Sequence, residues 1–300
     1  MKQNRLWFLY AMITVVAWGV WGAYIDTPAQ HHFPETLGYV VWAFVMIPPA
    51  LVALWIVGWK VEYDAKSIFW GCVAGFLGAG GQLILFKTLR LAPAYLVFPF
   101  IALSPVVTIA MALLLSKERA TMKGWIGIVL ALVAGVLLAY APPEGKASGG
   151  HSWVLLASLV LLAWGIQGFA ISHANKSMKA ESIFFYMMLT SVLLIPVALA
   201  MTDFSTPINW GFKGPYLAAA IQILNSVGAL LLVYAFRYGK AIIVSPLTNA
   251  GGPVVTVAIS LLTAYLYHEL VWNSAKTVNT VGIVAAIVAT VLMAIEGEKG

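Results

Sequence analysis

Carboxamide side chains inside apolar stretches are the residues of this 300-residue chain best suited to hold a small solute. An amide both donates and accepts hydrogen bonds, and a polar side chain in an apolar helix faces protein or a wet cavity because contact with lipid is costly. Gln222 and Asn225 are three residues apart, which places them on one face of a helix. We predict that they contact solute together with Gln82, Gln167 and Asn249; the alternative is that these amides only join helices.

Tryptophans supply the second half of this predicted pocket. Trp18 and Trp21 lie one turn apart in "AWGVWGAYI" at 17–25, and "AWGIQGFAI" at 163–171 repeats the phrase with Trp164 and Gln167. An indole stacks on a flat ring or holds a cation over its face. The alternative is packing of each indole in the groove beside a glycine. The predicted substrate-binding set is Trp18, Trp21, Gln82, Tyr95, Trp164, Gln167, Gln222, Asn225 and Asn249.

Prolines and a glycine pair interrupt two of the apolar stretches. A proline inside a helix removes a backbone donor and favours a kink. Such positions are predicted to act as hinges for motion, or as static kinks that only shape packing. They are Pro99 and Pro105 in one stretch, and Pro246, Gly251, Gly252 and Pro253 in another.

Catalytic chemistry finds no support in the sequence. There is no phosphate loop, metal-ligand spacing or nucleophile elbow, and no Asp or Glu falls near the middle of an apolar stretch. Asp26, His31, His32 and Glu35 cluster between two stretches, where we predict a solvated loop; metal binding by the adjacent histidines is the alternative. Glu118 is predicted to pair with Arg119. We expect no catalytic residue, no metal and no cofactor, and therefore no enzyme.

The composition places these residues in a membrane. Of all residues 62% are hydrophobic and 9% are charged, against roughly 25% charged in soluble domains. A helix needs about 20 apolar residues to cross the hydrocarbon core, and continuous apolar runs favour helices over a barrel. Ten stretches qualify: Leu6 to Ile25, Thr36 to Trp59, Ser67 to Phe86, Leu91 to Ser116, Gly124 to Ala141, Ser152 to Ser172, Ser182 to Thr202, Gly214 to Phe236, Ala241 to Tyr267 and Thr277 to Ile295.

The halves of the chain repeat one another. "PVVT" at 105–108 returns at 253–256, as the tryptophan-glycine phrase does. The predicted domains are a five-helix repeat at 1–140, a linker at 141–151 and a second five-helix repeat at 152–300. Because five is odd, the second repeat enters the membrane inverted, an arrangement typical of secondary transporters. With a cytoplasmic N-terminus, 12 of the 17 basic residues fall on the inner side, as the positive-inside rule requires.

The early Trp-Gly pair, the two "PVVT" phrases and "KER" at 117–119 resemble the EamA-type branch of the drug/metabolite transporter superfamily over essentially the whole chain. The resemblance implies ten transmembrane helices, with a central cavity formed by helices one, three, four, six, eight and nine and with helices five and ten at the periphery. Members move amino acids, sugars, nucleotide-sugars and drug-like compounds. "HEL" at 268–270 departs from the family pattern, since Leu270 stands where an arginine is expected.

Taken together, these features predict an all-α polytopic membrane protein that exports or exchanges small polar metabolites, such as amino acids, by alternating access. Transport of sugars or nucleotide-sugars is the alternative within the superfamily, and a non-transporting scaffold or a membrane enzyme is the alternative of another class. The expected partners are a small-molecule solute and the lipid bilayer, without nucleic acid, and a homodimer is left open. The expected location is the inner (plasma) membrane with both termini cytoplasmic.

Overall fold

All regular structure that is described in the computed structural model is helical, and the described residues are 5–92, 94–140, 152–267 and 276–297. Nine helical segments in these ranges are long and apolar enough to cross a membrane, and the shorter apolar helix Ser104–Leu115 belongs to the remaining predicted span. The chain is therefore an all-α polytopic membrane protein with ten spans, as predicted.

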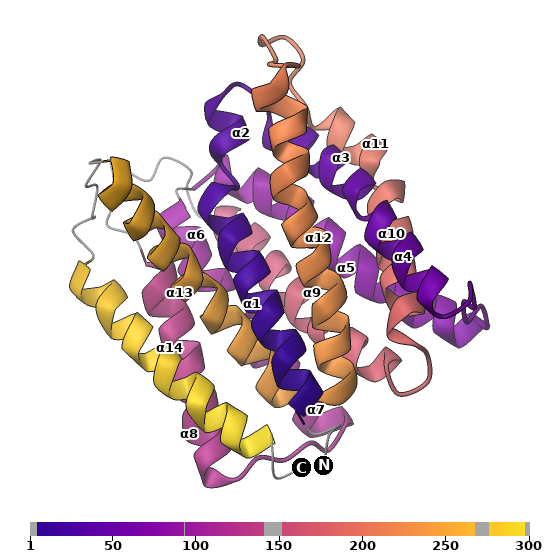
Figure 1. Ribbon diagram of the computed structural model, residues 1–300, viewed down its shortest axis with the longest axis vertical. Helices are drawn as coiled ribbons and strands as arrows, with labels where there is room; N and C mark the ends of the chain where they lie inside the picture. Colours follow the sequence, from indigo (N-terminus) through magenta and orange to yellow (C-terminus); the bar gives the residue numbers. More distant parts are fainter. Residues whose placement is uncertain (1–4, 93, 141–151, 268–275, 298–300) are drawn as a thin grey trace.

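Helices of the two halves follow one another in the same order. The first half contains α1 (Leu6–Tyr24), α2 (Thr27–Gln30), α3 (Glu35–Val45), α4 (Ile47–Ile56), α5 (Ala65–Leu89), α6 (Ala94–Ile101), α7 (Ser104–Leu115) and α8 (Met122–Ala139). The second contains α9 (Ser152–Ala174), α10 (Ala180–Leu193), α11 (Ile195–Ala200), the short π-helix η2 (Phe212–Tyr216), α12 (Leu217–Tyr238), α13 (Ala241–Tyr267) and α14 (Lys276–Gly297). Figure 1 shows that α1 begins and α14 ends at the same end of the molecule, here called the proximal end; α1 ends at the opposite, distal end.

Three spans that the sequence presents as continuous runs are each divided into two helices. The break lies at Met46 between α3 and α4, at Leu194 between α10 and α11, and at 102–103 between α6 and α7. In each case the second helix carries a proline in its first positions, where the missing N–H leaves no hydrogen bond unmade. Pro105 therefore begins a helix, whereas Pro246 and Pro253 lie inside the continuous helix α13.

The first helix of each half packs against the fourth span of the other half. Thr256 Oγ1 on α13 donates a hydrogen bond of 2.9 Å to the carbonyl oxygen of Gly19 on α1, and Thr108 Oγ1 on α7 donates one of 2.7 Å to that of Gly165 on α9. A Cβ on Gly19 would lie 2.3 Å from Cβ of Val255, and a Cβ on Gly165 would lie 2.5 Å from Cβ of Val107. The halves are thus interlocked through equivalent glycines, which permit close approach of the backbones.

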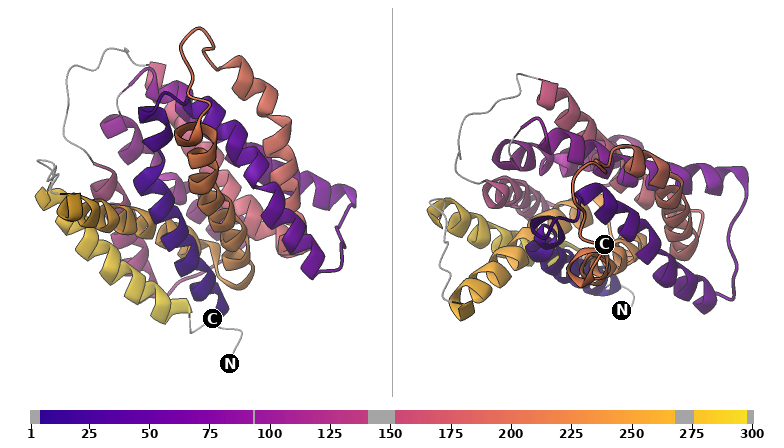
Figure 2. Two further views of the ribbon diagram at one scale, coloured as in Figure 1. Left: turned by 45° about the horizontal axis from the view of Figure 1, so that its top comes forward. Right: turned by 90° about the horizontal axis from the view of Figure 1, so that it is seen from above.

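Helices α8 and α14 pack against each other at one edge of the bundle, while α4 and α10 lie at the opposite edge (Figures 1 and 2). The two divided spans α3–α4 and α10–α11 therefore border the interior that α1, α5, α9 and α12 surround. The domain limits at 140 and 152 stay predictions, because the linker 141–151 lies outside the described residues, as do His268, Glu269 and Leu270.

Glu118 has a different partner from the one that the sequence predicts. Its Oε2 accepts a hydrogen bond of 3.1 Å from the backbone N–H of Ile242 in the first turn of α13, where unpaired amides and the helix dipole favour a carboxylate. Burial nevertheless raises the pKa of the Glu118 carboxyl above its usual range. The predicted local pair with Arg119 is replaced by a cap that joins the "KER" loop of one half to the ninth span in the other.

Candidate functional site

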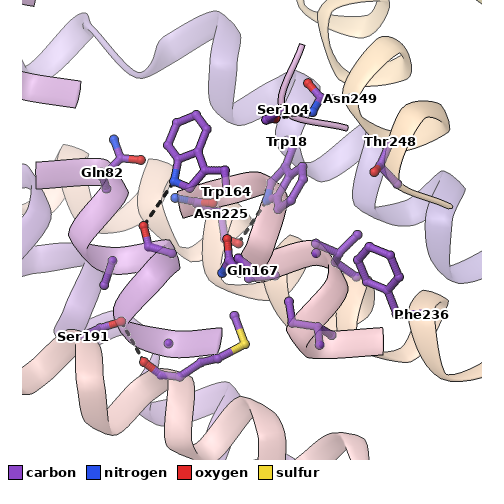
Figure 3. A pocket seen from close by; sticks show the side chains of 18 of the residues that line it. Trp18, Gln82, Ser104, Trp164, Gln167, Ser191, Asn225, Phe236, Thr248 and Asn249 are labelled. Carbon is purple, nitrogen blue, oxygen red and sulfur yellow. Dashed lines mark hydrogen bonds between the residues drawn. The ribbon is translucent and has the colours of Figure 1, made fainter. Parts of the chain in front are cut away.

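A central cavity of about 230 Å³ lies where the two halves meet. Side chains from α1, α5, α7, α9, α12 and α13 line it, which are the six spans that the family resemblance implies, and none of the described lining residues is charged. Helices α8 and α14 contribute nothing to the lining. Figure 3 shows Trp18, Gln82, Trp164 and Gln167 around this space.

Two tryptophans are held in the cavity wall by equivalent contacts. The indole Nε1 of Trp18 donates to the carbonyl oxygen of Asn225 at 3.3 Å, and Nε1 of Trp164 donates to that of Gly78 at the same distance. A Cβ on Gly228 would lie 2.6 Å from the Trp18 ring, so this indole fills the groove beside a glycine. Because both N–H groups are engaged with protein, the carbon surface of each ring is what remains for a solute.

Two of the predicted amides are free to bind a solute. The side chains of Gln82 and Gln167 line the cavity and make no hydrogen bond within the described ranges, and neither is among the fully buried polar groups without a partner. By contrast, Asn249 Nδ2 donates to Ser104 Oγ at 3.3 Å, although Asn249 also lines the cavity. Gln82 and Gln167 therefore offer donors and acceptors inside an otherwise apolar space.

Gln222 and Asn225 are divided between two cavities. Asn225 lines the central cavity, while Gln222 lines a distal vestibule of about 510 Å³ that also contains Asp26, Glu35 and Arg90. Trp21 and Gln82 line both spaces. Gln222 and Asn225 thus lie on one face of α12, as predicted, but they line different spaces.

Arg90, which lines the same vestibule as Gln222, donates to the carbonyl oxygen of Met201 at 3.3 Å.

A proximal pocket of about 270 Å³ lies at the other end of the central cavity. It shares Phe236 with that cavity and is lined by Lys176, Arg237 and Lys240 together with Glu118. Three spaces therefore follow one another from the distal to the proximal end, with the uncharged cavity in the middle.

The second and seventh spans also line the cavity, which corrects the six-helix expectation. Trp42 and Met46 come from the α3–α4 span, and Met187 and Ser191 come from α10. The sequence contains a signal for these positions, because "MIPPA" at 46–50 and "LIPVA" at 194–198 are repeat-related and mark the two equivalent breaks. Met46 lies at the first break, and Ser191 lies about one turn before the second.

The remaining predicted positions lie as follows. Tyr95 and Pro99 belong to α6, and their side chains are outside the described part of the chain. Gly251 is a packing position, since a Cβ there would lie 2.7 Å from Cγ2 of Val15. At Gly252 the nearest atom, Cβ of Trp18, would be 4.0 Å away. Tyr234 on α12, which is not in the predicted set, lies away from the cavity, and its hydroxyl donates to Glu181 Oε1 at 2.5 Å.

This arrangement is suited to hold a small solute. Ring surfaces, two free amides and the hydroxyl groups of Ser191 and Thr248 surround the space, and pockets of this kind bind through apolar contact with a few placed polar groups. In the described residues no group of three or more His, Cys, Asp or Glu side chains is placed to hold a metal ion.

Known proteins resemble this chain at the level of family and of fold. Residues 5–140 match the EamA-like transporter family. The chain is 24% identical over 212 residues to Protein LicB of Haemophilus influenzae, covering 67% of this chain and 70% of that protein. It is 28% identical over 80 residues to a probable 4-amino-4-deoxy-L-arabinose-phosphoundecaprenol flippase subunit ArnE of Hamiltonella defensa, covering 27% of this chain and 71% of that protein.

A solved crystal structure shares the fold, with a TM-score of 0.74 at 18% identity, and the match covers 94% of this chain and 98% of that one. The family match spans the first half of the chain, and the shared fold spans nearly all of it. The first half of the chain is therefore similar to the EamA-like transporter family, and the fold of nearly the whole chain is that of a known structure.

Proposed function

We propose that the chain is a secondary transporter that exports or exchanges small polar metabolites, such as amino acids or related compounds, by alternating access. The observation that carries this proposal is the uncharged central cavity with the free amides of Gln82 and Gln167. A buried site without charge favours solutes that are neutral or zwitterionic, because a lone charge would lose its hydration without a partner.

Cavity size supports a small solute. Sites for drug-sized ligands measure about 300–1,000 Å³, whereas the central cavity measures about 230 Å³. An amino acid fits a cavity of this volume better than a nucleotide-sugar does. Indole faces add affinity for an ammonium group, and the amides add hydrogen bonds to a carboxylate or hydroxyl.

The proposed location is the plasma (inner) membrane, with both termini cytoplasmic. Lys176, Arg237 and Lys240 at the proximal pocket support this orientation, because basic residues favour the cytoplasmic side. The proximal end is then the inner side and the distal end the outer side.

A thermal-shift screen of the purified protein tests the binding part of this proposal. Amino acids, sugars, polyamines and nucleosides are added one at a time, and a solute that binds the folded state raises the apparent melting temperature. We expect a shift with a zwitterionic or neutral compound, which is lost in the Gln82→Leu/Gln167→Leu double variant. A scaffold without a solute would show no shift in the whole panel.

A further inference from the structure

Helices α1 and α12 are joined by three hydrogen bonds in series, running from the proximal to the distal end. Thr14 Oγ1 donates to the carbonyl oxygen of Gly228 at 3.2 Å, and Trp18 Nε1 donates to that of Asn225 at 3.3 Å. Figure 1 shows the two helices side by side along this series. These first two bonds end on main-chain atoms, which move only when the helix itself moves.

The third bond ends on a side chain instead. Trp21 Nε1 donates to Gln222 Oε1 at 3.0 Å, and Asn225 Nδ2 also approaches this oxygen at 3.5 Å. A side-chain acceptor is released by a change of rotamer, a motion that is fast compared with domain movement. The contact can therefore open while the rest of the α1–α12 interface stays in place.

This bond lies at the boundary between two spaces. Trp21 lines both the distal vestibule and the central cavity, whereas Gln222 lines only the vestibule and Asn225 lines only the cavity. Gln82 on α5 also lines both spaces, so the boundary between them lies at Trp21 and Gln82, and the Trp21–Gln222 bond holds the Trp21 side of it.

The equivalent position in the other half lacks such a bond. Gln167 stands where the repeat places Trp21, and its side chain makes no hydrogen bond within the described ranges. It lies against α5, where a Cβ on Gly78 would be 2.1 Å from Gln167 Nε2. Repeat symmetry therefore does not explain the Trp21–Gln222 contact, which belongs to one side of the cavity alone.

We propose that Trp21 and Gln222 form the distal gate of the transporter, and that solute passes when the Gln222 amide exchanges the Trp21 indole for the solute. The inference rests on the proposed function for its direction of transport, but the gate is defined by access to the cavity. Both residues then determine which solutes pass, because the solute must offer a hydrogen-bond donor to the side-chain oxygen Oε1 of Gln222.

Access to the central cavity can be measured without any solute. In a Cys72→Ser background, Ala229→Cys places a thiol in the cavity lining, and a cationic methanethiosulfonate that does not cross membranes is applied to each side of membrane vesicles. Ser205→Cys, in the exposed distal loop after α11, identifies the distal side. The labelling rate from that side reports how often the gate is open.

Trp21→Phe and Gln222→Met each remove the hydrogen bond and keep most of the side-chain volume. Each is expected to raise the distal labelling rate about two- to tenfold, the change in open population that corresponds to one net hydrogen bond. The double variant is expected to equal the single variants, because both changes remove the same interaction. Thr14→Val, which removes the first bond of the series away from both cavities, leaves the rate unchanged.

Equal labelling in the parent and in both single variants would overturn the proposal, as would additive effects in the double variant or an equal increase with Thr14→Val. Size-exclusion profiles confirm that each variant is folded. Since no transport is measured, a negative result for the gate stays distinct from a negative result for transport.

Discussion

At the scale of single residues, the free amides distinguish a solute site from a packed interior. Gln82 and Gln167 line the cavity, are only partly buried and have no protein partner within the described ranges, so their amide groups are available to whatever fills that space. Asn249 and Asn225, which the sequence presents in the same way, have protein partners. From the sequence, the amides that join helices could not be separated from those that face solute, because the difference depends on contacts between distant spans.

Substitution of either free amide by leucine tests this distinction. Gln82→Leu or Gln167→Leu is expected to weaken binding of the solute found by thermal shift about two- to tenfold, as the loss of one hydrogen bond implies. Titration calorimetry measures the Kd. Thr290→Val on α14, outside the cavity lining, is the control and should bind as the parent does. An unchanged Kd in both glutamine variants would exclude these amides from the site.

At the scale of elements, equivalent glycines fix how the halves interlock. The repeat of Gly19 as Gly165 was visible in the sequence, and the structure shows that both allow the first helix to approach the other half. The repeated phrases "MIPPA" and "LIPVA" mark two of the divided spans, but a proline at the start of a helix and a proline inside one look alike in sequence, so the breaks themselves could not be predicted. Pro48, Pro105 and Pro196 begin helices, while Pro246 and Pro253 do not.

Two glycine variants test the interlocking. Gly165→Ala places a Cβ 2.5 Å from Cβ of Val107 and is expected to destabilise the protein by about 1–3 kcal/mol through overpacking. Gly80→Ala on α5 meets no atom within 4 Å and is expected to be neutral or to stabilise by up to about 1 kcal/mol, since alanine favours helix. Melting temperatures in detergent compare the two. Equal losses would show that close approach at Gly165 is not what holds these helices.

The Glu118 cap makes a prediction about pH. Because burial raises the pKa of this carboxyl in the folded state, its contribution to stability is full below the pKa of the unfolded chain and is lost as the pH rises through the raised folded pKa. Glu118→Gln keeps an acceptor for Ile242 N–H without the buried charge. Its melting temperature should exceed that of the parent at neutral pH and converge with it in acid.

Glu118→Ala removes the acceptor and should be less stable than the parent at every pH, because an unpaired N–H remains at the start of α13. If Glu118→Gln is as unstable at neutral pH as Glu118→Ala, the negative charge itself is required at that helix end.

At the scale of the whole molecule, composition and the internal repeat were sufficient to predict ten spans and the membrane. Apolar length and repeat symmetry are properties of the chain itself, which explains why they could be read directly. The three successive spaces could not be predicted from the sequence, because they form only where spans from both halves come together; Trp21, Gln82 and Phe236 lie at their boundaries. Trp21 and Gln167 occupy equivalent positions in the two repeats but have different contacts, and this difference could be found only from the structure.

Solute flux tests the central claim most directly. Purified protein is reconstituted into liposomes, and uptake of the solute found by thermal shift is followed with and without a pH gradient. Uptake should exceed that of protein-free liposomes, should persist in Thr290→Val and should fall about tenfold or more in the Gln82→Leu/Gln167→Leu double variant, since each lost hydrogen bond weakens binding. Uptake no greater than in protein-free liposomes, or a double variant that transports as the parent does, would contradict a transporter with its solute site in the central cavity.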